Sequence, residues 1–350
     1  MIRVLIVGTG TMARDHAQAY AAMSGATVVG AVDPNCANLQ AFCTQFNIEE
    51  SFPTIEDALG WGQFDAASIV TPDPVHARTT LPMLAAGKHV LCEKPLATNY
   101  ADANEMAIAA QLAGVTNMVN LSYRNVPALA KAAEMVAAGD IGEVRHFEAA
   151  YLQSWLTQAA WGNWRTQDQW LWRLSTAHGS MGVLGDVGVH ILDYATFAAG
   201  SDVARVSCRL HTFDKAPGGQ IGPYALDAND SMAMHLSLKN GAMGVIHASR
   251  FASGHLNDLT LRLYGTKGGL DVRFEQGKSR LRACLEDQLQ AQAWQDVDTP
   301  PVGTNYARFI DAIREGRQVQ PDFHQGAILQ QVLDLSLLSH GQMSQDQLVR

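Results

Sequence analysis

Apolar and polar residues follow one pattern up to about residue 122 of the chain and a different pattern after it. In the first part, short apolar runs bounded by glycine, proline or aspartate alternate with longer helical segments. This alternation predicts parallel strands joined by helices that cover both faces of the sheet. The predicted strands are residues 2–7, 27–33, 66–70, 89–93 and 118–121, and the predicted helices are residues 14–23, 76–86 and 102–113.

The second part is rich in β-forming residues. A helix predicted at 128–138 ends at Gly139, and Asn240-Gly241 is typical of a hairpin turn. A helix-like stretch at 182–199 interrupts the strands. We therefore expect an α/β chain with an N-terminal Rossmann domain (a doubly wound parallel sheet, residues 1–122) and a C-terminal α+β domain with a large open antiparallel sheet (residues 123–350). The predicted strands of the second domain are residues 144–152, 204–213, 231–238, 242–249, 259–264 and 269–274.

Composition narrows the class of protein. A chain of 350 residues with 47% hydrophobic and 17% charged residues is typical of a packed globular enzyme with two domains. The net charge of −9, without a basic cluster, disfavours nucleic-acid binding. The five cysteines are scattered and lack C-x-x-C spacing, so we expect reduced thiols and no metal site. The chain opens with a strand and has no membrane-length apolar run, so we expect a cytoplasmic protein without a signal peptide or membrane partner.

A glycine-rich turn joins the first predicted strand to the first predicted helix. Its sequence, Gly8-Thr-Gly10-Thr-Met-Ala13, has the pattern G-x-G-x-x-A. Gly8 would permit a tight turn, Gly10 a close approach of a pyrophosphate to the backbone, and Ala13 close packing of helix on strand. The helix N-terminus would supply N–H groups and a positive dipole end to the phosphates. The turn therefore predicts a dinucleotide site.

Asp33 ends the second predicted strand, where a carboxylate can accept both ribose hydroxyls of the adenosine. The same carboxylate would repel a 2′-phosphate, and Pro34 and Asn35 offer no arginine to hold one. This favours NAD over NADP. The alternative is that Asp33 caps a helix that starts near Ala37.

Lys94 follows the apolar strand at residues 89–93 and precedes Pro95. A lysine at the mouth of a buried strand can lose water and meet a ligand, although such a lysine can equally be a solvated edge residue. Gly8, Asp33 and Lys94 all lie at carboxyl ends of predicted parallel strands, as does the loop at Thr71. Ligands of such sheets bind in the crevice outside these ends.

Asp186 and His190 are four residues apart on the predicted helix at 182–199, hence on one face. The aspartate could orient the imidazole or raise its pKa. The alternative is a surface pair of no chemical importance. Gly182, Gly185 and Gly188 favour a site, because glycine is costly in a helix unless the backbone approaches something closely.

Five of the chain's seven tryptophans lie between residues 155 and 172. Aromatic faces suit the C–H faces of sugar rings, with Arg165 and Gln167 as donors to hydroxyl groups. Packing in a subunit interface would also explain the cluster. Both explanations stay open.

Together these motifs resemble the glucose–fructose oxidoreductase / inositol dehydrogenase / rhizopine-catabolism family, abbreviated Gfo/Idh/MocA. The resemblance covers nearly the whole chain, and its most specific part is the stretch at 185–193, Gly-Asp-Val-Gly-Val-His-Ile-Leu-Asp, which is similar to D-x-G-x-H-x-x-D. Two departures are Ala13, where a third glycine is common, and Gly179-Ser-Met-Gly182, where the family has three glycines. The other matching segments are residues 8–16, 71–76, 93–95 and 138–144.

The resemblance implies an NAD(P)-dependent oxidoreductase that moves a hydride between nicotinamide and a hydroxyl-bearing carbon of a sugar, cyclitol or sugar derivative. His190 is the expected base, Lys94 the group that stabilises the alkoxide, and Asp186 a residue that fixes the substrate or the imidazole. The expected cofactor contacts are Gly8, Gly10, Thr11, Met12, Asp33, Thr71, Pro72, His76, Glu93 and Lys94. The expected substrate contacts are Lys94, Tyr123, Arg124, Trp164, Arg165, Asp186 and His190.

Two other functions fit the same fold. One is a glycosidase that uses NAD for transient oxidation and elimination, and the other is a non-catalytic sugar-sensing regulator. The combination of Lys94, Asp186 and His190 argues against the regulator, which has no need of them. An open sheet needs a cover, and family members commonly pair their sheets across subunits, so we expect a homodimer or homotetramer.

Overall fold

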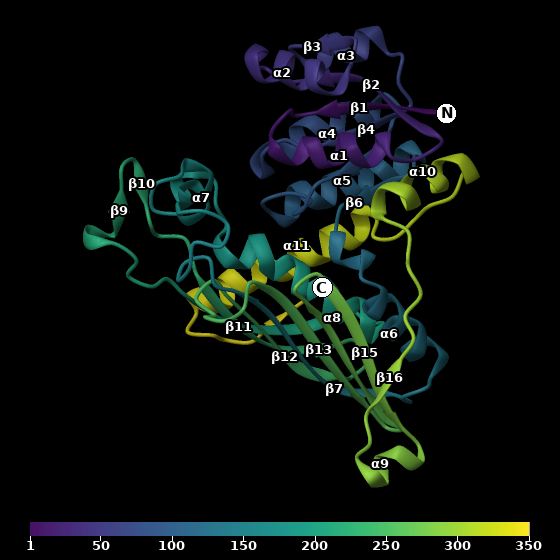
Figure 1. The fold of residues 1–350 in the computed structure, drawn as a ribbon, viewed down its shortest axis with the longest axis vertical. Helices are drawn as coiled ribbons and strands as arrows, with labels where there is room; N and C mark the ends of the chain where they lie inside the picture. Colours follow the sequence, from purple (N-terminus) through teal and green to yellow (C-terminus); the bar gives the residue numbers. More distant parts are fainter. Residues whose placement is uncertain (350) are drawn as a thin grey trace. The chain divides into compact units, whose positions relative to one another are not determined.

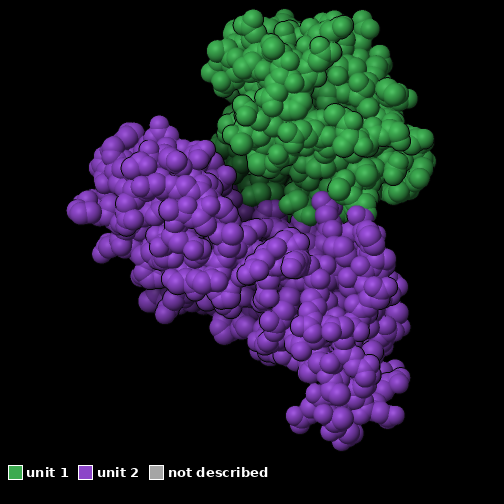
Figure 2. All heavy atoms as spheres, viewed as in Figure 1, with its two compact units in different colours: residues 1–122, 303–330 green, residues 123–302, 331–350 purple. Residues whose placement is uncertain are grey.

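The structure, a computed structural model, describes residues 1–349. The chain forms two compact units: Met1–Ser122 with Gly303–Gln330, and Tyr123–Val302 with Gln331–Arg350 (Figure 2). The first boundary lies where the hydrophobic pattern changes. The sequence analysis assigned residues 303–330 to the C-terminal domain, whereas they pack with the first unit.

The first unit contains a parallel sheet of six strands in the order β3-β2-β1-β4-β5-β6 (Figure 1). This order reverses direction between β1 and β4, which creates a switch point at the carboxyl ends of these strands. The Rossmann arrangement predicted from the alternation is confirmed. The strands are β1 Ile2–Val7, β2 Ala26–Val32, β3 Glu50–Phe52, β4 Ala66–Ile69, β5 His89–Cys92 and β6 Asn117–Val119.

Helices of the first unit come from both ends of the chain. The amphipathic helix α10 buries Phe309 and Ile310 in the same core as Val4 and Ile6 of β1. This burial explains why residues 303–330 belong here, because removing α10 would expose the core. The helices are α1 Thr11–Ala21, α2 Cys36–Phe46, α3 Ile55–Trp61, α4 His76–Ala85, α5 Tyr100–Ala113, α10 Asn305–Glu315 and the start of α11 Phe323–Gly341.

The second unit contains a sheet of nine strands in the order β16-β15-β14-β13-β7-β12-β11-β8-β17. Its neighbouring strands are antiparallel except β7 and β12, which pair in parallel. The predicted large antiparallel sheet is thus confirmed. Its strands are β7 Val144–Gln153, β8 Val203–His211, β11 Ser231–Leu238, β12 Met243–Ser249, β13 Asn257–Gly265, β14 Gly268–Glu275, β15 Lys278–Leu285, β16 Gln295–Val297 and β17 Gln347–Leu348.

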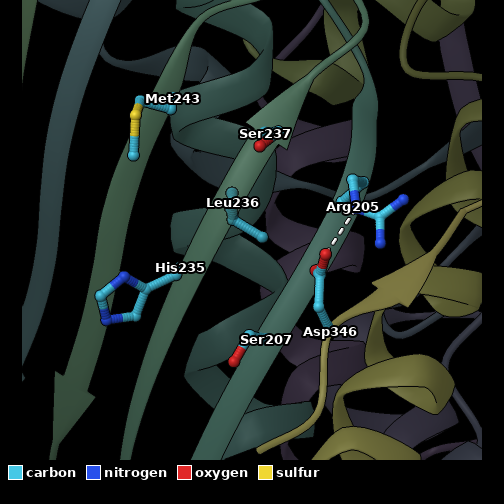
Figure 3. Close-up of a pocket in the computed structure, with 7 residues that line it drawn as sticks. All are labelled: Arg205, Ser207, His235, Leu236, Ser237, Met243 and Asp346. Atoms are coloured by element: carbon cyan, nitrogen blue, oxygen red, sulfur yellow. Dashed lines mark hydrogen bonds and ion pairs between the residues drawn. The ribbon is translucent and has the colours of Figure 1, made fainter.

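One face of this sheet packs against helices. On β11, Met232, Met234, Leu236 and Leu238 are buried, and the residues between them are exposed or partly exposed. Figure 3 looks onto the other face, with the strands in front of the helices, where Arg205 pairs with Asp346. The helices of the second unit are α6 Pro127–Ala138, α7 Asp168–Leu171, α8 Val189–Ala199, α9 Asp287–Ala291 and the end of α11.

The tryptophan-rich segment builds a small hydrophobic core of its own. Trp155 and Trp164 are buried together with Leu171, Leu174 and Leu226. A two-stranded ribbon, β9 Gln220–Ile221 with β10 Tyr224–Ala225, adds Ile221 and Tyr224 to this core. Packing within the unit therefore accounts for Trp155 and Trp164, which neither of the two open explanations foresaw.

Among the described residues, no helix is both long and apolar enough to cross a membrane. The five cysteines are free thiols, and four of them are buried.

Candidate active site

The glycine-rich turn after β1 has the geometry that a dinucleotide needs. Gly8 has a φ of +93°, and a Cβ there would lie 2.7 Å from the carbonyl oxygen of Val70, so only glycine fits. A Cβ at Gly10 would meet nothing within 4 Å. Gly10 is also the N-cap of α1 and gives its first turn no side-chain acceptor. The backbone N–H groups of this first turn thus have open space beside them, which fits a pyrophosphate.

Thr11 and Met12 form the exposed start of α1, and Met12 has 45% of its surface exposed. Ala13 is completely buried against the sheet. An alanine methyl group therefore fits where the family commonly has a third glycine.

Asp33 closes the next strand and is anchored to the same turn. Its Oδ2 accepts hydrogen bonds from the N–H and the hydroxyl of Thr9, at 2.8 and 2.7 Å. Its Oδ1 accepts the N–H of Asn35 at 2.8 Å. A carboxylate has about four acceptor positions, so ribose hydroxyls can still bind. The alternative role as a helix cap is wrong, because Asn35 caps α2 through the N–H groups of Ala37 and Asn38.

Glu93 lies at the carboxyl end of β5 in a buried polar network. Its Oε1 accepts hydrogen bonds from His16 Nε2 at 2.8 Å and from Asn120 Nδ2 at 2.6 Å. His16 is fully buried, with Nδ1 3.2 Å from the hydroxyl of Ser68 and the ring of Tyr306 packed edge-on at 4.8 Å. Burial alone would raise the pKa of Glu93, but His16, Asn120 and Lys94 together lower it to about 2. Glu93 therefore stays ionised inside the unit.

Lys94 follows this anchored glutamate directly. Its backbone N–H donates to Glu93 Oε2 at 3.3 Å, and its side chain is partly exposed. The Lys94–Pro95 peptide bond is cis. The sequence predicted a strand-end lysine here, and the structure places it two residues beyond the end of β5.

His76, the first residue of α4, is fully buried between two loops of the first unit. Its Nδ1 lies 2.8 Å from the carbonyl oxygen of Pro95, and its Nε2 lies 2.9 Å from the carbonyl oxygen of Thr71. Both ring nitrogens are therefore occupied by backbone groups. His76 holds the loops together, whereas the sequence analysis expected it to contact the cofactor directly. Thr71 and Pro72 lie beyond β4, on the loop whose Thr71 carbonyl oxygen contacts His76.

In the second unit, Asp186 lies on a π-helical turn, Leu184–Gly188, that leads into α8. π-helical turns are rare in proteins overall, but those that occur are often found at functional sites. A Cβ at Gly185 would lie 2.4 Å from the Cβ of Met181, and one at Gly188 would lie 2.9 Å from the Sδ of Met232. These glycines therefore allow close packing against the protein's own side chains, which accounts for them without a ligand.

Two arginines hold the carboxylate of Asp186. Arg250 Nη2 donates to Oδ2 at 2.9 Å, and Arg173 Nη1 donates to Oδ1 at 3.1 Å. The Arg250 side chain has no exposed surface, lies over the ring of Trp155 and donates to the carbonyl oxygen of Arg173. Two positive charges favour the carboxylate over the protonated acid, so Asp186 is suited to accept hydrogen bonds.

His190, on the first turn of α8, is 7% exposed and lies among aromatic rings. The ring of Tyr123 packs edge-on against it at 4.9 Å, and that of Tyr151 lies at 6.4 Å. Burial raises the pKa of both phenols, and the charge of Asp186 adds to the effect, so both hydroxyls stay protonated. The sequence analysis named Tyr123 and His190 as two separate substrate contacts. It did not predict that their rings pack together.

The two phenols and Asn257 close a triangle of hydrogen bonds. Tyr151 donates to Asn257 Oδ1 at 2.7 Å, Asn257 Nδ2 donates to Tyr123 at 2.8 Å, and the two phenol oxygens are 2.5 Å apart. Gln153 donates to Asn257 at 2.9 Å and accepts from Trp155 Nε1 at 3.1 Å. The two rings that pack beside His190 are thus held in place by a network of hydrogen bonds.

Three expected substrate contacts have partners within the second unit. Arg124 is 4% exposed and makes a two-pronged ion pair with buried Asp193 at 2.6 and 2.9 Å. Trp164 is 4% exposed in the small core and donates to the carbonyl oxygen of Leu156 at 3.2 Å. Arg165 is exposed and stacks on Trp164 at 4.5 Å. Burial and internal partners account for Arg124 and Trp164, whereas the exposed Arg165 stays a predicted substrate contact.

The residues that the sequence analysis missed are spread along the chain. Tyr151 and Gln153 share one side of β7, and Asn257 lies opposite Gln153 in the register with β13. Polar Tyr151 and Gln153 at i and i+2, with apolar Ala150 and Leu152 on the opposite side of the strand, were the available signal. Arg173 and Arg250 gave no pattern, because their partner lies 13 and 64 residues away.

Two family models match the chain in succession. Residues 2–121 match the oxidoreductase family with an NAD-binding Rossmann fold, and residues 129–271 match the GFO/IDH/MocA C-terminal domain. Together they span both units of the fold.

Curated relatives and solved structures agree with this match. Levoglucosan dehydrogenase of Pseudarthrobacter phenanthrenivorans is 26% identical over 93% of this chain and 92% of its own. The 1,5-anhydro-D-fructose reductase of Ensifer adhaerens is 29% identical over 76% and 74%. A levoglucosan dehydrogenase structure with NADH and levoglucosan superposes with a TM-score of 0.86 at 26% identity, covering 100% of this chain and 99% of that one. An oxidoreductase domain protein from Kribbella flavida gives 0.85 at 29% identity, with both chains fully covered. The chain therefore belongs to the GFO/IDH/MocA family of NAD-binding oxidoreductases.

Proposed function

We propose that this oxidoreductase transfers a hydride between nicotinamide and a hydroxyl-bearing carbon of a sugar, cyclitol or sugar derivative. The observation that carries the proposal lies in the second unit, where the rings of Tyr123 and Tyr151 pack beside His190 and the charge of Asp186 acts on both tyrosines. A sugar ring offers apolar C–H faces to the rings and hydroxyl groups to the acceptors. Relatives named levoglucosan dehydrogenase, D-apiose dehydrogenase and D-glucoside 3-dehydrogenase support the same substrate class.

In this proposal, His190 accepts the proton of the reacting hydroxyl. Imidazole suits the task because its ordinary pKa lies near neutral pH. Lys94 donates a hydrogen bond to the same oxygen and stabilises its developing negative charge. Asp186 accepts a hydrogen bond from a substrate hydroxyl and stays in place through Arg173 and Arg250.

The turn at Gly8 and Gly10 would hold the cofactor's pyrophosphate, and Asp33 its adenosine ribose. When bound, NAD supplies the ring that takes the hydride. Thr71 and Pro72 remain proposed cofactor contacts on the loop after β4. The chain's own part is to position the substrate and to move the hydroxyl proton.

A panel of sugars, anhydrosugars and cyclitols, each mixed with NAD and the purified protein, tests the proposal. Rising NADH absorbance with at least one of them is the expected result. Cleavage of a glycoside without net formation of NADH would instead show that the protein is a glycosidase that uses NAD only transiently. If the protein binds NADH and a sugar but converts none of the compounds, it would be a non-catalytic sugar-sensing regulator.

A further inference from the structure

The contacts of the His76 ring determine its protonation state. Both ring nitrogens face carbonyl oxygens, Nδ1 that of Pro95 at 2.8 Å and Nε2 that of Thr71 at 2.9 Å. A carbonyl oxygen only accepts hydrogen bonds. A neutral imidazole has one N–H, so one of the two contacts would set a lone pair against a lone pair. Only the imidazolium, with two N–H groups, satisfies both carbonyls.

The surroundings contain terms for and against this charge. His76 has no exposed surface and opens α4, and both burial and the helix dipole oppose a cation there. Asp73, in the preceding 3₁₀ turn, and Cys92, at the end of β5, are the titratable groups that face the ring. Burial lowers the pKa of His76, but Cys92, Asp73 and the Pro95 carbonyl outweigh it and raise the pKa to about 10.

The two carbonyls belong to loops with different proposed tasks. Thr71 lies in the loop after β4, which we propose contacts the cofactor, and Pro95 follows Lys94, which we propose acts on the reacting oxygen. The other side of Lys94 is fixed as well, because its N–H donates to Glu93. The short segment that carries the lysine is therefore fixed at both ends by buried groups.

We propose that His76 is a buried imidazolium that positions Lys94, by clamping the carbonyls of Thr71 and Pro95 with one N–H each. This proposal extends the function proposed above, since it assumes that Lys94 acts on the substrate. His76 is a positioning residue, because both of its nitrogens are engaged with backbone groups.

Nitrogen-15 NMR of the histidine rings in the whole protein tests the charge. The His76 resonances are assigned through its own backbone. We expect protons on both ring nitrogens at about pH 8, well above the ordinary pKa of histidine. A single protonated nitrogen at that pH would overturn the proposal. This measurement needs no substrate, so it stands even if no sugar is oxidised and the proposed function fails.

Kinetics test the positioning. His76→Gln removes the charge and has one N–H₂ group for two carbonyls, so kcat per NADH-binding site should fall by roughly 10–100-fold. His76→Lys keeps a cation and should retain more of kcat. Met83→Leu alters another fully buried residue of α4 with little change of volume, and its kcat should stay near that of the wild type.

Counting sites by NADH binding separates positioning from folding. A merely structural residue would reduce the number of NADH sites and leave kcat per site unchanged, and that result would overturn the positioning role. An equal loss in Met83→Leu would do the same, because it would trace the effect to packing. If His76→Gln does not fold, the comparison of His76→Lys with Met83→Leu decides in its place.

Discussion

Arg250 donates a 2.9 Å hydrogen bond to the carboxylate of Asp186 from a position where the arginine side chain has no exposed surface. Asp186 itself keeps 24% of its side chain exposed. The buried cation thus lies behind the aspartate and leaves part of the carboxylate accessible. Such an arrangement fixes an acceptor without consuming it, which suits the binding of a hydroxyl group better than proton transfer.

The first prediction concerns this pair. Arg250→Met removes one of two cations from Asp186 and a buried hydrogen bond to the backbone. We expect a loss of about 2–4 kcal/mol in the free energy of unfolding, near the cost of breaking a buried pair. We also expect KM for the substrate to rise while the Kd of NADH, held by the other unit, stays unchanged. Denaturant titration, steady-state kinetics and NADH fluorescence measure the three quantities.

Arg280→Met is the matched control, because Arg280 and Asp296 pair with 57% and 65% of their side chains exposed. Ion pairs this exposed contribute little to the free energy of unfolding, because water and salt screen them. Equal destabilisation by the two variants would show that burial of Arg250 adds nothing. An unchanged KM in Arg250→Met would separate Asp186 from substrate binding.

The second prediction uses the low pKa of Glu93. A carboxyl group with a folded pKa of about 2, against an ordinary 4.5, stabilises the fold fully above about pH 4.5. This contribution is lost as the pH falls from 4.5 toward 2, because the unfolded chain binds the proton first. Glu93→Gln keeps the shape without the charge, so we expect it to cost roughly 2–4 kcal/mol at pH 7 and progressively less below pH 4.5.

Urea unfolding of the wild type and of Glu93→Gln between pH 7 and pH 3 measures the difference between their free energies of unfolding, called the gap below. Glu105→Gln, at an exposed position of α5, serves as the control and should show a small gap at every pH. A gap for Glu93→Gln that does not narrow with acid would contradict the ionised state of Glu93.

Local patterns predicted the strands and turns of the first unit well. The first predicted strand, residues 2–7, coincides with β1, and the turn at Gly8 has the positive φ that the motif requires. These features depend on near neighbours in the sequence. Membership of α10 in the first unit was missed, because only the burial of Phe309 against β1 reveals it.

Long-range polar contacts explain the other errors. Arg124 was expected at the substrate, but it pairs with Asp193, which lies 69 residues further along the chain. Trp164 was expected to stack on a sugar, but it fills a core completed by Leu226. Spacing within one helix or strand cannot reveal such partners, since they come from elements that meet only in the fold.

The third prediction concerns the cofactor. The carboxylate of Asp33 would face the 2′-phosphate of NADP, so we expect NAD to bind more tightly by about 1–3 kcal/mol, or roughly tenfold to a hundredfold. Asp33→Ser should narrow this gap because the repulsion disappears. Fluorescence titration with NADH and NADPH measures both affinities. Equal or tighter binding of NADPH to the wild type would sink the idea.

The fourth prediction concerns the open face of the nine-stranded sheet. Met243 is 57% exposed there, lies opposite Ser237 of β11, and lines the same hollow as His235 and Arg205 (Figure 3). If a second copy covers this face, sedimentation at micromolar concentration should give a dimer or tetramer. Met243→Glu should weaken the association, whereas Ile108→Glu, at a 49% exposed position of α5, should not. A monomeric wild type would exclude this arrangement.

The last prediction concerns the chemical step. If Lys94 and His190 act on one hydroxyl, Lys94→Ala and His190→Ala should each lower kcat by roughly 10²–10⁴, the range of general acid–base groups. The double variant should lose little more, because groups that serve one transition state fail together. The Kd of NADH should change little, since Gly8, Gly10 and Asp33 hold the phosphates and ribose in our proposal. The profile of kcat/KM for oxidation should rise with pH through one ionisation, which His190→Ala removes. Wild-type turnover by His190→Ala on a confirmed substrate would refute its role as the base. The contact of its ring with Tyr123 would then be only a packing contact of α8.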